Sequence, residues 1–344
     1  MDTDKFNRIR IKDSTKFRLP SSLIDEYPGY RSFNKNSSLM NIQYEFDLKS
    51  GDWLEAELTK ATRNDQLDSR ESVESIMEND LCIRDLGYIT MPYLKGVSNN
   101  NAYFLNRLPP KMGIYQMKSG KVQAIDWKKI HAKMSKNKLP HLAIDVLIDK
   151  KEKLKTRMLI VAVSEQTAEG RIRNAIKSGK RKKGYTPTEE YKIKAHYNIF
   201  ITNVPEELIS LAEIPQIYRL RWQIELIFKT WKSLASIDKV KHVKKERFEC
   251  QLFARLIWLI FNWRLFQVID HSIKKASPNN GCSMLKFFNM VNKQTFSFRR
   301  ILTEIQNKNL WLRNVFIPLI PDLIIEKKKD KDTHLQILNS IFDS

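Results

Sequence analysis

The sequence has few of the residues that build disulfide frameworks or zinc sites. Among its 344 residues are three cysteines and six histidines. Cys82, Cys250 and Cys282 are far apart and odd in number, which fits a reducing compartment and argues against a disulfide framework. The histidines are scattered and form no metal-ligand pattern. A disulfide-stabilised secreted domain and a zinc module are therefore excluded.

Long hydrophobic runs are also scarce. The most apolar segment, LIWLIFNW at 256–263, has eight uncharged residues between Arg255 and Arg264, whereas a helix needs roughly 20 to cross a bilayer. The first residues, MDTDKFNRIRIKD, contain no apolar stretch of the kind found in export signals. We therefore expect a buried helix at 256–263, no membrane partner and a cytoplasmic location.

Acidic residues are too few to balance the basic ones. Sixty Lys+Arg against 39 Asp+Glu leave a formal charge of +21, with an isoelectric point near 9.7. A surplus of this size favours a polyanionic partner, most commonly nucleic acid, although a basic enzyme or a protein on anionic membranes has the same composition. The length and the 42% of hydrophobic residues predict about two domains with a substantial core.

Hydrophobic periodicity over the first 108 residues predicts a mixed sheet flanked by helices. The expected elements are a strand within 6–20 ending near Asp13, a hairpin over 41–59 broken at Ser50-Gly51, a helix within 64–79 capped by Asp68 or Ser69, a strand over 81–85 ending at Asp85, a helix around 91–97 and a strand over 102–108. This order indicates an α/β fold.

The pattern changes at Pro109-Pro110. The next segment contains strand-like runs and a stretch, RIRNAIKSGKRKKG, with seven Lys/Arg and no acid. A strand at 197–205 returns to the main sheet, and mainly helical sequence follows to about 270. We expect a split α/β domain over 1–108 and 196–270, a β-rich basic insertion over 109–195, and a helical C-terminal region over 271–344.

Three acids are placed where they could bind metal. Asp13 and Asp85 are expected at strand ends, and Glu225 lies on a later helix. Carboxylates that converge at a sheet edge suit magnesium, which prefers oxygen ligands. Two such ions about 4 Å apart can activate a water or hydroxyl and stabilise the leaving oxygen of a phosphodiester. The alternative is that each aspartate is a solvated cap or turn residue.

The segment YRLRWQIELIFKTWK at 218–232 has one acid among cations on one face of a predicted helix. Tyr218, Arg221, Glu225 and Lys232 follow at helical spacing, so they share a stripe. An acid that binds a metal beside cations that hold phosphate oxygens would account for this stripe. An ordinary surface pair between Arg221 and Glu225, contributing about 0.3 kcal/mol, is the alternative.

The pattern Y-x2-R-x3-E-x6-K formed by these four residues resembles the YREK signature of bacterial insertion-sequence DDE transposases. KDSTKFRLP resembles the DST-type segment around the first aspartate of that family, and IRDLGYITMPYL resembles the D-L-G-Y segment around the second. AYFLNRL and NIFITNVPEEL resemble the strands that flank the insertion. The resemblance runs in the same order from about residue 6 to 270.

The resemblance implies an RNase H-like mixed sheet flanked by helices, with a β-rich domain inserted before the helix that bears the glutamate. Asp13, Asp85 and Glu225 would be the catalytic, metal-binding acids, holding two Mg2+ ions with Mn2+ as a substitute. It also implies cleavage at the transposon end, transfer of the freed 3′ hydroxyl to target DNA, and often a hairpin intermediate. The residues expected to contact DNA are Tyr218, Arg221, Lys229, Lys232, Arg171, Arg173, Lys180, Arg181, Lys182 and Lys183, of which Lys229 follows from helical spacing and the last six from the basic run.

The expected partners are DNA, as transposon ends and target, and a second copy in the DNA complex, within the bacterial nucleoid. Members of the family usually have a helical DNA-binding region before the first aspartate, whereas Asp13 lies twelve residues after Met1. The alternatives are therefore an N-terminally truncated, inactive DNA-binding product that inhibits intact transposase, and an RNase H-like nuclease. For the basic run, a solvated loop is the alternative to a surface that follows phosphates.

Overall fold

The computed structural model describes residues 5–30, 37–181, 184, 186–277, 280–293, 317–326 and 337. The chain forms two compact units. The first unit comprises Met1–Asp4, Asp13–Asn64 and Leu220–Ser344, and the second comprises Lys5–Lys12 and Asp65–Arg219. The strand β1 (Arg8–Leu19) contributes its first residues to the second unit and the others to the first.

The strands of the first unit follow from simple alternation. β2 (Ser38–Asp47) and β3 (Trp53–Lys60) form the predicted antiparallel hairpin, and Gly51 between them has φ +73°, a conformation that favours glycine. β1 lies beside β2 and runs to Leu19, so the expectation that it ends near Asp13 is wrong. It continues because buried Thr15, Phe17 and Leu19 alternate with more exposed residues beyond Asp13.

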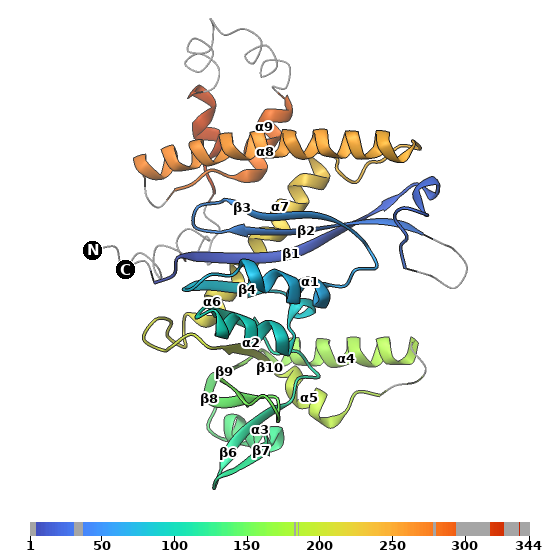
Figure 1. The fold of residues 1–344 in the computed structure, drawn as a ribbon. Helices are drawn as coiled ribbons and strands as arrows, with labels where there is room; N and C mark the ends of the chain where they lie inside the picture. The colour runs from blue at the N-terminus through green and yellow to red at the C-terminus, as the bar shows by residue number, and fades with distance from the viewer. Residues whose placement is uncertain are drawn as a thin grey trace, which may run out of the picture. The chain divides into compact units, whose positions relative to one another are not determined.

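Helices complete the first unit. They are α7 (Trp222–Ser233), α8 (Lys245–Ala276) and α9 (Met284–Lys293). A short 3-10 helix, η6 (Ile317–Leu323), follows them in the chain and packs on α9. α9 contacts both α7 and α8 (Figure 1). The predicted helix at 256–263 is part of α8, but its residues Ile257, Ile260 and Phe261 are exposed, so the expectation of a wholly buried helix is wrong.

The second unit is built on a parallel core. β4 (Asp80–Arg84) pairs in parallel with β1 and with β5 (Tyr103–Arg107). All five residues of β4 are buried, as is usual for a parallel strand covered on both faces. α1 (Asp65–Glu71) and α2 (Met91–Asn99) pack against each other over these strands (Figure 1). The short 3-10 helices η2 (Ser72–Ser75) and η3 (Leu86–Tyr88) connect them.

The rest of the second unit extends this sheet with antiparallel strands. The strands are β10 (Tyr197–Thr202), β9 (Leu154–Ala162), β8 (His141–Ile148), β6 (Ile114–Lys118) and β7 (Lys121–Ala124), hydrogen-bonded in that order beyond β5. Their helices are α3 (Trp127–Lys136), α4 (Glu165–Arg181), α5 (Glu189–Ala195) and α6 (Ile214–Arg219), with α5 contacting both α3 and α4. The segment 109–195 therefore contains four of the described strands.

The strand order confirms the predicted fold class. β3, β2 and β1 follow one another in the first unit, and β1, β4 and β5 follow one another in the second. Antiparallel pairing of β2 with β3 and parallel pairing of β4 with β1 and β5, together with the helices, give the mixed α/β class that the sequence predicts. The division into 1–108, 109–195, 196–270 and 271–344 stays a prediction, since the compact units divide the chain at other positions.

Two expectations about helices need correction. α1 begins at Asp65, and neither Asp68 nor Ser69 caps it, because both lie inside the helix rather than at its N-terminus. The single helix expected over 218–232 is two helices, since α6 ends at Arg219 and α7 begins at Trp222. Backbone hydrogen bonds from residues 223 and 224 to residues 220 and 221 span three residues, the tighter 3-10 spacing, at this break.

Candidate functional site

Two of the three predicted acids meet at one arginine in the first unit. The Arg221 guanidinium donates from Nη1 to Asp13 Oδ2 at 3.2 Å and from Nη2 to Glu225 Oε1 at 2.5 Å. The side chains of Asp13 and Glu225 are 21% and 33% exposed, so solvent reaches both carboxylates. Residues 208 positions apart in the sequence thus form one partly buried cluster of two acids and one cation.

Aromatic packing holds this cluster in place. Trp231, on the same helix as Glu225, is 1% exposed and lies against the Tyr44 ring with centroids 4.8 Å apart. Its ring is also 5.1 Å from Trp53 and 5.6 Å from Phe228. Because Tyr44 and Trp53 belong to β2 and β3, these contacts fix α7 on the sheet of the first unit, and Glu225 lies partly buried beside this packed face.

The lysines of α7 differ in what they contact. Lys232 donates from Nζ to the backbone carbonyl of Lys16 on β1 at 3.0 Å, so it ties the end of α7 to the strand that carries Asp13. Lys16 in turn donates to the Tyr30 hydroxyl at 2.9 Å. Lys229 is exposed. Of the two lysines predicted to contact phosphate, Lys229 therefore has a solvated ammonium group, whereas that of Lys232 is bonded within the protein.

The remaining residues of the predicted motif lie in the second unit. Asp85 is half-buried and follows β4 directly, at the start of η3, as the sequence predicted. β1 and β4 are in parallel register with Lys12 opposite Arg84, and the next residues along the two strands are Asp13 and Asp85. Tyr218, on α6, packs edge-on against the Phe200 ring, with centroids 5.4 Å apart.

Sequence reasoning missed a set of buried charges at this end of the second unit. Lys12 pairs with Asp68 at 2.8 Å, with both side chains at most 1% exposed. Arg84 is fully buried, donates to Ser72 Oγ at 2.8 Å and lies 4.5 Å from the centre of the Tyr93 ring. Because buried charges need partners, these cations fix the strand ends that precede the predicted aspartates. The segment RIRIK at 8–12 could have indicated these pairs, because its isoleucines predict a buried strand and its cations would then need partners.

Asp80 anchors two further arginines of β1. Arg8 donates to Asp80 with Nε at 2.8 Å, and Arg10 approaches the same carboxylate at 3.3 Å. Arg10 and Asp80 are buried. These bonds fasten the start of β1 to the start of β4, which keeps the two strands in their parallel register.

The basic run of 171–184 is helical up to Arg181, because α4 continues to that residue. Arg171 donates to the carbonyls of Ala195 and Tyr197 and to Asn198 Oδ1, so it fastens α4 to β10. Burial, and then the charge of Arg107, lower the pKa of the Arg171 guanidinium. Arg173 and Lys180 are exposed, whereas the Arg181 side chain, Lys182 and Lys183 lie outside the described residues.

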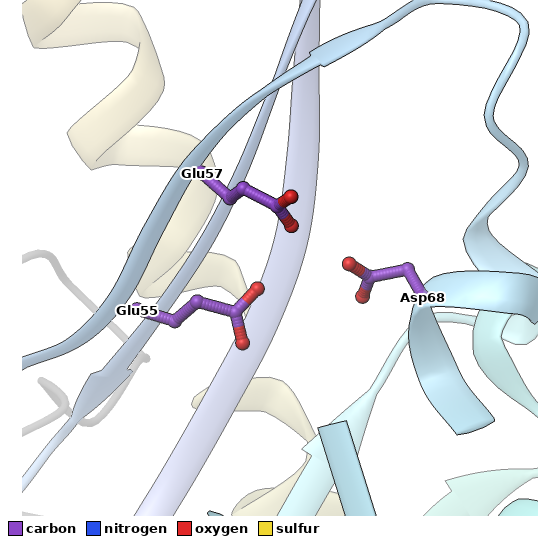
Figure 2. Close-up of side chains that lie close together, drawn as sticks. All are labelled: Glu55, Glu57 and Asp68. Atoms are coloured by element: carbon purple, nitrogen blue, oxygen red, sulfur yellow. The ribbon is translucent and has the colours of Figure 1, made fainter. Parts of the chain in front are cut away.

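Three other carboxylates are drawn in Figure 2, and they differ from the predicted acids. Glu55 and Glu57 are alternate residues of β3, so they project from the same face of that strand. Glu57 pairs with Arg63 at 2.8 Å. Asp68 of α1 is buried and already paired with Lys12 within its own unit. We assign no metal to these acids.

Trp127 in the second unit is 7% exposed and covered by Lys194, whose Nζ lies 4.6 Å from the ring centre. Its packing therefore favours a structural role for this ring.

Comparison with known proteins gives consistent matches. Residues 4–261 match the family model described as transposase DDE domain. The transposase for insertion sequence element IS231E of Bacillus thuringiensis subsp. finitimus is 34% identical over 265 residues, which are 73% of this chain and 55% of that protein. The transposase for IS231C of Bacillus thuringiensis subsp. berliner is 32% identical over 353 residues, covering 98% of this chain and 71% of that protein.

The aligned part of this chain spans only about half the length of the first of these relatives. Among solved structures, a piggyBac transposase synaptic complex with hairpin DNA matches with a TM-score of 0.47 at 10% identity, covering 97% of this chain and 62% of that one. A likeness at this level carries no conclusion about the chain.

Proposed function

Because this chain belongs to the transposase DDE domain family, we propose that it is the catalytic core of an insertion-sequence transposase. Its reaction would be metal-dependent cleavage of DNA strands at the ends of the element, followed by transfer of the freed 3′ ends to target DNA. The family acts on DNA, which agrees with the excess of basic residues, and it implies use of a divalent metal.

The observation that carries this proposal is the convergence of Asp13 and Glu225 on Arg221. A strand and a helix from distant parts of the sequence bring two carboxylates to one point, which a pair of solvated surface acids has no reason to do. The sequence places Asp13 and Glu225 in the motifs that resemble the family's catalytic segments. The contact therefore supports the catalytic assignment over the reading of an isolated surface pair.

The parallel register supports Asp85 as the third acid. Lys12 and Arg84 are partners in adjacent strands, and each is followed by one of the predicted aspartates. Residues at the carboxyl ends of neighbouring parallel strands emerge at the same edge of a sheet, and adjacent strands are about 4.8 Å apart. The buried pairs of Lys12 and Arg84 hold these strand ends in position.

The donor set fits magnesium. Asp13, Asp85 and Glu225 offer only carboxylate oxygens, which suit a hard cation that keeps several of its waters. We propose two Mg2+ ions, with Mn2+ as a substitute, which when bound would activate the attacking hydroxyl and stabilise the leaving oxygen. A cation at Asp13 and Glu225 would compete with the Arg221 guanidinium for the same carboxylate oxygens.

The chain's own cations would position the DNA. Arg221, Lys229 and Lys232 lie on or next to α7, the helix of Glu225, where their charges can hold phosphate oxygens beside the acids. Tyr218 is proposed to contact a terminal phosphate through its hydroxyl. We further propose that the protein works as a homodimer on the two DNA ends, in the bacterial cytoplasm and associated with the nucleoid.

The proposed activity is tested with the purified chain and a duplex that carries the DNA bordering its coding sequence. We expect strand breaks that require Mg2+ or Mn2+ and that Asp85→Asn abolishes, while DNA binding measured by gel shift persists. DNA binding without cleavage in either metal would overturn the catalytic proposal. That result would instead favour the inhibitory product, the alternative that the family match does not favour. Cleavage of any duplex regardless of its sequence would indicate a nuclease.

The exposed face of α4 is predicted to bind DNA phosphates. Replacing Arg173 and Lys180 together by alanine should weaken DNA binding at low salt and make the slope of log K against log salt shallower by roughly 2, because each phosphate contact contributes about 0.9. Fluorescence anisotropy at several salt concentrations measures both quantities. The matched control replaces Lys95 and Lys192, which are ion-paired with Glu152 and Glu189. Equal slopes for both double variants would show that α4 is only a solvated face.

A further inference from the structure

The long helix α8 has two different faces. Its inner face is buried in the first unit through residues that include Leu252, Leu259 and Ile273. Trp263 belongs to the same face, and its indole nitrogen donates to the carbonyl of Gly51 at 2.6 Å. The inner face therefore has its partner, the β2–β3 hairpin and the helices around it.

The outer face of α8 carries a stripe of large apolar side chains. Their exposed fractions are 51% for Phe253, 67% for Ile257, 44% for Ile260, 41% for Phe261 and 63% for Val268. The spacing of three, four and seven residues keeps them on one side of the helix. A contiguous exposed apolar patch on a soluble protein usually marks an interaction surface. We call these five residues the α8 stripe.

We propose that the α8 stripe is the contact between two copies of this chain, with the two α8 helices packed antiparallel about a twofold axis between Ile260 and Phe261. A twofold interface needs a patch that is complementary to itself. The stripe meets this condition, because antiparallel pairing about that point sets Phe253 opposite Val268 of the second copy. The same pairing sets Ile257 against the aliphatic stem of Arg264.

Charges at the two ends of α8 favour the same orientation. Glu246 is exposed in the first turn, and Lys275 is exposed in the last turn, on the line of the stripe. Antiparallel pairing about the proposed axis sets Glu246 of each copy opposite Lys275 of the other. A parallel pair would instead set Glu246 against Glu246. Antiparallel helices also align opposite ends of the helix dipoles, which is favourable.

The buried area is sufficient for a dimer. A large apolar side chain buries roughly 150–250 Å2 when fully covered, so five that are about half exposed hide on the order of 450 Å2 per copy. Two copies would remove about 900 Å2, and flanking positions such as Cys250 and Ala254, which are exposed, add to this. The total reaches the ~1,000 Å2 expected of a specific interface.

A membrane is the other possible partner of an apolar helix. Among the described residues, α8 is the one helix that is long and apolar enough to cross a bilayer, a criterion that core helices of soluble proteins also meet. Its inner face is packed on protein, and two of its arginines are bonded to the first unit: Arg255 donates to the carbonyls of Ser236 and Lys239, and the exposed Arg264 pairs with Asp52 at 2.7 Å. A spanning helix would have to give up these contacts, so a second copy fits better.

The inference deepens the homodimer of the proposed function, and its test needs neither DNA nor metal. Sedimentation equilibrium of the full chain should show a dimer, and Ile257→Lys should weaken dimerisation by roughly 100-fold, because it sets a lysine against Arg264 of the second copy within an apolar interface. Ile257 is 67% exposed, so the variant should fold normally, which circular dichroism checks. The matched control is Leu285→Lys on α9, 44% exposed and off the stripe, which should remain dimeric.

A cysteine cross-link tests the antiparallel register. Cys250 is the exposed cysteine, whereas Cys82 and Cys282 are buried, and burial and then the charge of Asp270 raise the pKa of the Cys282 thiol to about 12. The proposed pairing sets Cys250 of one copy opposite His271 of the other. With copper phenanthroline as oxidant, His271→Cys should give a disulfide-linked dimer, while the natural sequence should not. The double variant His271→Cys with Cys250→Ser should lose the link.

The outcomes separate the possible errors. A monomer at all concentrations, or a dimer unaffected by Ile257→Lys, would overturn the proposal whatever the DNA-cleavage assay shows. Cross-linking of the natural sequence through Cys250 would overturn the antiparallel arrangement. Binding of the monomer to phosphatidylcholine vesicles, lost in Ile257→Lys, would assign the stripe to a membrane surface instead. Loss of cleavage with an intact dimer would count against the proposed function alone.

Discussion

Replacing Glu225 with glutamine is expected to lower the rate of metal-dependent strand cleavage by about 1,000-fold or more, with little change in DNA affinity. The substitution keeps the shape of the side chain and its helix but removes the charge that meets Asp13 at Arg221. A bound metal stabilises the charge of the transition state by several kcal/mol, and each 1.4 kcal/mol is about a factor of ten in rate. Single-turnover cleavage of an end-labelled duplex measures the effect.

The acids of β3 provide the control for this variant. Glu57→Gln removes one carboxylate of the set in Figure 2 but leaves Asp13, Glu225 and Arg221 unchanged. We expect cleavage by Glu57→Gln to stay within about twofold of the natural rate, in line with most exposed substitutions. The reverse pattern, with Glu225→Gln active and Glu57→Gln inactive, would mean that the metal binds at β3 and that Glu225 is an ordinary partner of Arg221.

Replacing Trp231 with alanine is expected to destabilise the first unit by about 3–5 kcal/mol, the usual effect of removing a large buried aromatic side chain. Trp231 is 1% exposed and contacts Tyr44, Trp53 and Phe228, so the cavity has rigid walls that cannot easily collapse. Urea unfolding followed by circular dichroism measures the loss. Because the same contacts hold α7 on the sheet, cleavage should fall as well, even where the variant remains folded.

A second tryptophan on the same helix controls for this result. Trp222 begins α7 and is 55% exposed, so Trp222→Ala removes the same side chain without opening a cavity. The free energy of unfolding should change by no more than about 0.5 kcal/mol. Similar losses for both variants would show that tryptophan content, rather than the packing between α7 and the β2–β3 hairpin, accounts for the stability.

The fold was largely predictable because its strands either alternate or have a short apolar centre. The hairpin of β2 and β3 follows from alternation around Gly51, and the buried strand β4 follows from LCIRD. The position of Asp85 after β4 is therefore a consequence of local pattern alone. Helical spacing likewise placed Glu225 and Lys232 on one helix, which α7 confirms.

The features that were missed depend on contacts between distant residues. The break between α6 and α7 has no proline or glycine to mark it, since residues 219–222 read RLRW. The contact of Arg221 with Asp13 joins positions far apart in the sequence, so spacing alone could not predict it. Spacing could not predict the pair of Lys12 and Asp68 either, because the lysine needs a partner only once its strand is buried.

The distribution of tryptophans makes the two units optically distinct. Among the described residues, Trp53, Trp222, Trp231, Trp258 and Trp263 lie in the first unit, and Trp127 lies in the second. Rings in contact, such as Trp53 with Trp231 and Trp263, exchange excitation energy, whereas Trp127 is covered by a lysine ammonium group. Fluorescence of a Trp127→Phe variant would therefore report the unfolding of the unit that carries Glu225 and Arg221, separately from the unit that carries Asp85.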